Sequence, residues 1–118
     1  MSLTKTDRKI RAISGNNFPP EHFVEALAAA LHRQFDSTQG AVKTVALLTG
    51  SNQKTVKNWF DGTNGPNGTS LVSLCRHSDL VLETVLLFAG RHEQLRARKL
   101  ADIREKLREM LDLMDALD

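Results

Sequence analysis

Cysteine, tyrosine and proline are scarce or absent in this chain of 118 residues, and long apolar runs are missing. The single cysteine, Cys75, excludes an internal disulfide framework and is typical of a reducing compartment. No apolar run approaches the ~18 residues that span a bilayer. The first residues also lack the apolar core of a signal peptide. We therefore expect a cytoplasmic protein.

A large excess of charge of one sign is also missing, since the formal net charge is only +2. The charge is unevenly distributed along the chain. Residues 1–18 carry a single acidic side chain and four basic ones: Lys5, Arg8, Lys9 and Arg11. The last seven residues contain no basic side chain and three acidic ones: Asp112, Asp115 and Asp118. This balance neither demands nor excludes a nucleic-acid partner, and we expect residues 1–18 to form a basic flexible arm.

The alternation of apolar and polar residues that marks a β-strand is missing as well. Apolar residues instead recur at spacings of three and four, which is typical of helices. The sequence therefore predicts an all-α fold, with a domain over residues 19–90 and a long C-terminal amphipathic helix within 91–118. Start and stop signals divide the domain into helices over 19–35, 39–48, 52–60, 69–77 and 79–90. The expected N-caps are Ser51 or Asn52 for the third helix, and Thr69 or Ser70 for the fourth.

Residues 42–61 contain the most informative spacing in the chain. Two short helices separated by Thr49-Gly50-Ser51 predict a helix-turn-helix unit. Gly50 accepts the positive φ that lets the chain reverse within a tight turn, and the small side chain of Ala46 lets the two helices approach closely. The residues expected to hold the unit together are Val45, Ala46, Gly50, Val56 and Trp59.

With those side chains inward, helical geometry turns a polar set without acidic residues outward. Asparagine and glutamine can make two hydrogen bonds to adenine, and lysine can bond guanine or a phosphate. We therefore expect the second helix of the unit to enter the major groove of double-stranded DNA. The expected base-reading residues are Asn52, Gln53, Lys54, Lys57 and Asn58.

Residues 42–61 resemble the helix-turn-helix of lambda-repressor-like (Cro-like, XRE-type) DNA-binding domains, and the similarity extends over about residues 20–90. The resemblance implies a five-helix domain that binds a palindromic operator as a dimer. The chain departs from the family at Ser51, where an apolar residue is common. It departs again at Val42, where a glutamine usually contacts a phosphate; Gln39 is too early for that position. The expected contacts to the DNA backbone are Lys43, Ser51, Thr55 and the arm residues Lys5, Arg8, Lys9 and Arg11.

The C-terminal segment carries the heptad seam of a coiled coil. Its apolar residues alternate spacings of three and four: Leu100, Ile103, Leu107, Met110, Met114 and Leu117. At ~1.5 Å per residue the seam is roughly 27 Å long. Two arrangements stay open, because the helix can pack on its own domain or pair with a second copy as a homodimer through residues 100–117. Leu111 and Leu113 widen the stripe and favour self-association.

Three other segments have two possible roles each. The arm either enters a minor groove beside the site or is a solubilising tail. The loop over residues 62–68 either holds a phosphate or only connects two helices. A basic cluster at the start of the long helix either contacts phosphates or is a solvated face: Arg91, Arg96, Arg98 and Lys99.

Catalytic and metal-binding patterns are missing from the sequence. The four histidines are scattered, and His22 and His32 are too far apart to share one helical face as a metal-binding pair does. Cys75 is more typical of a small buried hydrophobic residue than of a nucleophile. We expect no enzymatic activity, no metal and no cofactor, and no pocket for a small-molecule effector is evident.

The main prediction is a sequence-specific DNA-binding transcriptional regulator of bacterial or phage type that acts as a dimer at the nucleoid. An alternative in another class is a DNA-organising adaptor, such as the recognition subunit of a phage packaging machine, which forms higher oligomers. A third is a protein-interaction module without a nucleic-acid partner.

Overall fold

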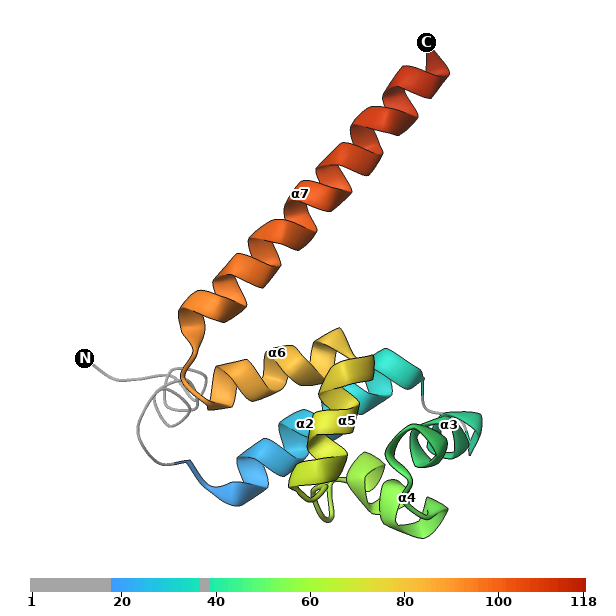
Figure 1. Cartoon of the computed structure of the whole chain (residues 1–118), viewed down its shortest axis with the longest axis vertical. Helices are drawn as coiled ribbons and strands as arrows, with labels where there is room; N and C mark the ends of the chain where they lie inside the picture. Colours follow the sequence, from blue (N-terminus) through green and yellow to red (C-terminus); the bar gives the residue numbers. More distant parts are fainter. Residues whose placement is uncertain (1–17, 37–38) are drawn as a thin grey trace, which may run out of the picture.

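The computed structural model describes residues 18–36 and 39–118. These residues form six α-helices and no strand, labelled as in Figure 1: α2 (Pro20–Phe35), α3 (Gln39–Thr49), α4 (Gln53–Asp61), α5 (Gly68–His77), α6 (Asp79–Phe88) and α7 (His92–Leu117). The predicted all-α fold is confirmed for this part of the chain. Within the same ranges, no helix combines the length and the apolar character needed to cross a membrane. The arm residues lie outside the described residues: Lys5, Arg8, Lys9 and Arg11.

Asparagine side chains determine where two of these helices begin. The Oδ1 of Asn52 accepts a hydrogen bond from the backbone N–H of Thr55 at 2.8 Å, so Asn52, one of the two expected residues, caps α4. The Oδ1 of Asn67 accepts in the same way from Ser70 at 2.8 Å. The expectation that Thr69 or Ser70 caps α5 is therefore wrong. Asparagine is as good an N-cap as serine, and α5 begins directly after Asn67.

The hydrophobic core lies where α2, α3 and α4 meet α5 and α6 (Figure 1). Its largest fully buried side chains come from all five helices: Leu27, Leu31, Val45, Val56, Leu74 and Val81. Trp59 on α4 adds the indole ring to this core and is only 2% exposed. The apolar side of α4 is thereby held against the rest of the domain.

The sequence of α6 is apolar nearly all round, and the helix packs against α2, α5 and α7. Its surface is not fully covered, since Leu82, Leu86 and Leu87 are half-buried. Glu83 is buried on this helix, and its Oε2 accepts a hydrogen bond from Nζ of Lys99 at 2.9 Å. The buried carboxylate is therefore paired with a cation on the next helix.

α7 begins against α6 and then projects away from the other helices (Figure 1). Two ion pairs hold its first turns, from Arg98 to Asp79 and from Lys99 to Glu83, both at 2.9 Å. Every residue over 100–118 is exposed. Of the two arrangements left open for the seam, the described part of the chain does not adopt the one in which the seam packs on its own domain.

Candidate nucleic-acid interface

The turn that joins α3 to α4 is built around Gly50. Its φ of 69° lies in the left-handed region, where a residue with a side chain is strained. A Cβ at this position would meet no atom within 4 Å, so the backbone angle alone favours glycine. The Oγ1 of Thr49 donates to the carbonyl of Val45 at 2.8 Å and closes the last turn of α3. Gly50 therefore occupies the turn position predicted for it.

The inward face of α4 carries the apolar side chains that orient this helix. Val56, Trp59 and Phe60 are 0%, 2% and 5% exposed, and their i, i+3 and i+4 spacing is that of one helical face. The same core contains Val45 of α3, which is fully buried, and Ala46, which is half-buried at its edge. The residues predicted to hold the motif together are thus brought together.

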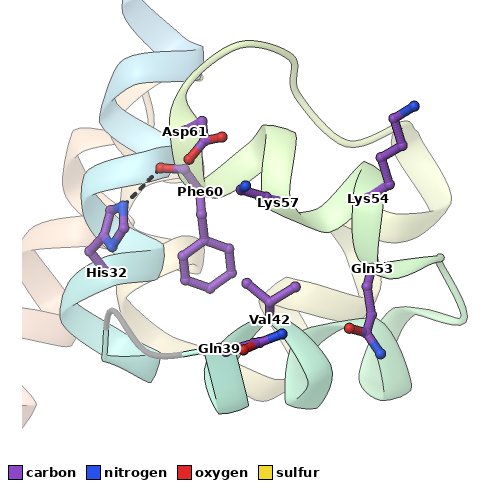
Figure 2. Close-up of a pocket in the computed structure, with 8 residues that line it drawn as sticks. All are labelled: His32, Gln39, Val42, Gln53, Lys54, Lys57, Phe60 and Asp61. Atoms are coloured by element: carbon purple, nitrogen blue, oxygen red, sulfur yellow. Dashed lines mark hydrogen bonds between the residues drawn. The ribbon is translucent and has the colours of Figure 1, made fainter.

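The C-terminal end of α4 is tied to α2 through His32. Its Nε2 donates to the carbonyl oxygen of Phe60 at 2.8 Å, and the two rings meet edge to face with centroids 5.2 Å apart (Figure 2). Gly62 then ends α4 with a φ of 73°, and its N–H donates to the carbonyl of Trp59. Sequence reasoning misses this role of His32, because the contact joins residues 28 positions apart and no periodic pattern signals it.

The outward face of α4 is polar and basic (Figure 2). Gln53, Lys54, Thr55 and Lys57 are exposed, as predicted. The acidic residue of this helix, Asp61, stands at its last position. The buried apolar side chains of α4 and its exposed basic side chains therefore lie on opposite faces of the helix.

Three of the predicted contact residues are already engaged within the fold. Asn52 uses its Oδ1 to cap α4, which holds the side chain against the helix N-terminus and occupies one of the two lone pairs of the amide oxygen. The Oγ of Ser51 lies 3.3 Å from the Oγ of Ser70 on α5. Asn58, which was expected to point outward, is half-buried. The chain turns back over it after α4, and the N–H of Thr63 donates to its carbonyl at 3.0 Å.

Two hollows flank Gln53, which lines both of them. The first has a volume of about 580 Å³, and its lining includes Gln39, Gln53 and Lys57 (Figure 2). The second has a volume of about 610 Å³ and follows the turn, where its lining includes Lys43, Leu47 and Gln53. The polar side chains of α3 and α4 around these two hollows form the candidate surface.

Two residues on this surface are missed by sequence reasoning. Gln39 stands too early for the family's phosphate-contacting position, yet α3 begins at Gln39 and the side chain lies beside Val42 in the first hollow (Figure 2). Leu47 is 86% exposed on the second hollow, although its apolar side chain suggests a core position. The i, i+4 spacing of Leu47 from the outward Lys43 is the signal that could have found it.

The lysines of this surface differ in their pairing from the cations elsewhere. The three ion pairs found among the described residues all lie on α6 and α7. None of them involves Lys43, Lys54 or Lys57, which are exposed. An exposed cation that forms no ion pair can bind an external anion without first breaking an internal pair. The electrostatics of the surface therefore favour an anionic ligand.

Cys75 lies on α5 and is half-buried against the core. Burial raises the pKa of its thiol, which keeps the less reactive neutral form populated. Over residues 18–36 and 39–118, no group of three His, Cys, Asp or Glu residues is arranged to hold a metal ion.

Comparison of the chain with family models, curated proteins and solved structures found no match. The interpretation of this surface therefore depends on its own geometry: a tight turn, one buried face of α4 and an opposite basic face that is bordered by two hollows.

Proposed function

We propose that this protein is a sequence-specific, double-stranded DNA-binding transcriptional regulator. Its fold would be the five-helix type of lambda-repressor-like domains, with α4 as the recognition helix. The observation that carries the proposal is the two-sided character of α4. Val56, Trp59 and Phe60 are buried on one side, while Gln53, Lys54 and Lys57 are exposed on the other.

The dimensions and position of α4 suit a DNA groove. Its nine residues span roughly 14 Å at ~1.5 Å per residue, and the major groove of B-DNA, about 12 Å wide, admits a helix. α3 and α4 lie at the end of the molecule opposite the free end of α7 (Figure 1). The projecting helix therefore leaves the recognition surface accessible.

The polar side chains divide into base readers and phosphate contacts. Gln53 is the main candidate for base recognition, because its amide can donate to and accept from adenine. Lys54 and Lys57 reach either guanine or a phosphate. Lys43 and Gln39 on α3 supply the contacts that position the helix along the DNA backbone.

A single α4 reads only a few base pairs, so the proposal includes a dimer. Helix-turn-helix dimers bind half-sites one helical turn apart, about 34 Å, which doubles the number of bases read. The exposed seam over 100–117 is the surface proposed to join the two copies.

The decisive experiment is a selection from random duplexes at about 150 mM salt, where non-specific binding is weak. It is run with the unmodified protein, Gln53→Ala and Lys57→Ala. Gln53→Ala is expected to relax the preference at one position, at a cost of about 1–3 kcal/mol. Lys57→Ala in a phosphate role weakens binding to all sequences and lowers the slope of log affinity against log salt by about 1.

Two matched variants control for the loss of any exposed glutamine or cation outside α4. Gln94→Ala removes an exposed glutamine at the start of α7, and Arg76→Ala removes an exposed cation of α5. Both are expected to leave the selected sequence and its affinity unchanged. Equal enrichment by all five proteins would contradict the assignment of α4 as the recognition helix. Absence of salt-sensitive binding to any duplex would instead favour a protein-interaction module.

A DNA-organising adaptor is the second candidate function. It is favoured by the width of the exposed apolar face of α7, where Leu111 and Leu113 flank the seam and are 60% and 66% exposed. A face wider than two helices cover would support rings or higher oligomers. Sedimentation equilibrium separates the candidates, because a stable species well above a dimer is expected only of the adaptor.

A further inference from the structure

The free part of α7 carries a continuous apolar face that the described part of the chain does not cover. Eight large apolar side chains on it are more than half exposed: Leu100, Ile103, Leu107, Met110, Leu111, Leu113, Met114 and Leu117. The same helix is held at its start by the ion pairs of Arg98 and Lys99 with α6. A helix that is anchored at its N-terminal end and carries a long uncovered apolar face is suited to pair with another helix.

Charge is strongly polarised along this free helix. Residues 99–108 contain four basic and two acidic side chains, whereas residues 109–118 contain four acidic and no basic ones. The acidic half includes the C-terminal turn, where no basic residue is present. Carboxylates there face the partial negative charge of the helix C-terminus, which is unfavourable for an isolated helix. The helix therefore has an electrostatic mismatch that no described residue of its own chain relieves.

We propose that two copies of α7 pair in antiparallel orientation, so that the basic half of each helix lies along the acidic half of the other. This inference rests on the self-association included in the proposed function and adds the orientation and the register. A parallel pair would align the two acidic halves and the two basic halves with each other. The seam spacing places Glu109, Asp112 and Asp115 on the outer face of the helix, so the attraction acts at long range between halves of opposite net charge and is strongest at low salt. At the flanks of the seam, a parallel pair would bring Arg104 beside Lys99 of the partner subunit, and the antiparallel pair avoids this contact between like charges.

The seam has a register in which every apolar layer is filled. Leu100 lies level with Leu117 of the partner subunit, Ile103 with Met114 of the partner subunit, and Leu107 with Met110 of the partner subunit. The layers then repeat in reverse order about a twofold axis between residues 107 and 110. All six seam residues on each helix are thereby buried against the other copy.

The same register accounts for the two leucines that widen the stripe. Arg104 comes beside Leu111 of the partner subunit, and Lys106 comes beside Leu113 of the partner subunit. Long basic side chains cover apolar surface with their aliphatic stems while the charged group stays in water. The antiparallel pair thus covers Leu111 and Leu113 without a third helix, which favours a dimer over a higher oligomer.

The orientation determines where the two DNA-binding surfaces lie. In the antiparallel pair the two Leu100 residues are roughly 26 Å apart along the axis, since 17 intervals rise by ~1.5 Å each. The two domains therefore lie at opposite ends of the helix pair. In a parallel pair both domains would emerge at the same end.

Disulfide trapping tests the orientation in a Cys75→Ala background. Two single variants, Leu100→Cys and Leu117→Cys, are oxidised separately and as a mixture. The antiparallel register predicts that only the mixture forms a covalent dimer, because residues 100 and 117 of different copies share a layer. Neither substitution is expected to unfold the domain, since both side chains are exposed, and circular dichroism checks this. Covalent dimers of Leu100→Cys alone would overturn the antiparallel orientation.

A second test neutralises the acidic half of α7, because the two orientations predict opposite changes in the dissociation constant of the dimer. The triple variant Asp112→Asn/Asp115→Asn/Asp118→Asn removes six carboxylates from a dimer. For the antiparallel pair the dissociation constant is expected to rise by roughly two- to threefold at low salt, because these outward-facing carboxylates attract the basic half of the partner only at long range, and to change less at about 150 mM salt. A parallel pair would instead be tightened, because the variant removes like-charge repulsion.

The outcomes also separate this inference from the proposed function. A dimer that shows parallel cross-links or tighter association in the triple variant contradicts the orientation alone. Sedimentation of the unmodified chain as a monomer at its highest soluble concentration contradicts both self-association and this inference. Neither result bears on α4, whose DNA contacts are tested by the duplex selection with Gln53→Ala and Lys57→Ala.

Discussion

Asn52 offers a substitution for which fold stability and DNA affinity are expected to change in opposite directions. Its Oδ1 accepts from the N–H of Thr55 at 2.8 Å and caps α4. Asn52→Ala removes the cap and is expected to destabilise the protein by about 1 kcal/mol. For a helical domain of this size that corresponds to a melting temperature lower by about 4–8 °C. Asn52→Asp keeps an acceptor oxygen and places a negative charge at the helix N-terminus, which adds about 0.3–1 kcal/mol of stability.

The same aspartate would oppose the proposed DNA contact. In the proposed complex a carboxylate at this end of α4 would approach the phosphates of the groove edge, so Asn52→Asp is expected to weaken duplex binding by roughly tenfold or more at low salt. Thermal denaturation and fluorescence anisotropy with a labelled duplex measure the two effects. Asn67 provides the matched control, because it caps α5 with the same 2.8 Å geometry. Asn67→Asp is expected to raise stability by the same amount, about 0.3–1 kcal/mol, and to leave duplex affinity unchanged. Unchanged duplex affinity of Asn52→Asp would refute the placement of this end of α4 against DNA.

Three further outcomes follow from the geometry. Gly50→Ala is expected to destabilise the fold by about 1–2 kcal/mol, measured by urea denaturation, because a left-handed φ disfavours a side chain although space is free; equal stability would mean that the turn has another conformation. Trp59→Ala is expected to cost about 3–5 kcal/mol in the same assay, since the indole is buried; full stability would contradict the burial of Trp59. Raised pKa and half burial predict slow alkylation of Cys75 near pH 8, with the rate rising as pH increases; reaction as fast as that of a free thiol would contradict them.

The helices were predictable because their determinants are local. Apolar spacing and N-cap residues depend on neighbours within one turn, so the bounds of α3, α4 and α7 fall within one or two residues of expectation. The N-cap residue of α5 was not predictable in the same way, since Asn67, Thr69 and Ser70 are all good caps. Only the path of the preceding loop decides between them. The direction of α7 depends on tertiary contacts, namely the pairing of Lys99 with the buried Glu83.

The sequence could predict which side of α4 is buried and which is exposed, but not which exposed residues are contacted by other segments of the chain. The side chains of Val56 and Trp59 could be assigned inward because their spacing is periodic. The half burial of Asn58 depends on how the chain turns back after Gly62, and the contact between Ser51 and Ser70 joins two helices. Both depend on contacts between segments that no periodic pattern encodes.

The polar residues left free on α4 bear directly on how specificity could arise. With Asn52 engaged as a cap and Asn58 half-buried, the exposed candidates for base reading are Gln53, Lys54 and Lys57. Three contacts at about 1–3 kcal/mol each give about 3–9 kcal/mol of discrimination, against the roughly 4–10 kcal/mol by which specific sites exceed non-specific DNA. One copy therefore reaches most of that range only if its contacts are near the upper end of their values, whereas two copies, at about 6–18 kcal/mol, lie within or above it even with average contacts. Loss of pairing through α7 should consequently reduce sequence discrimination as well as affinity, even though α7 touches no base.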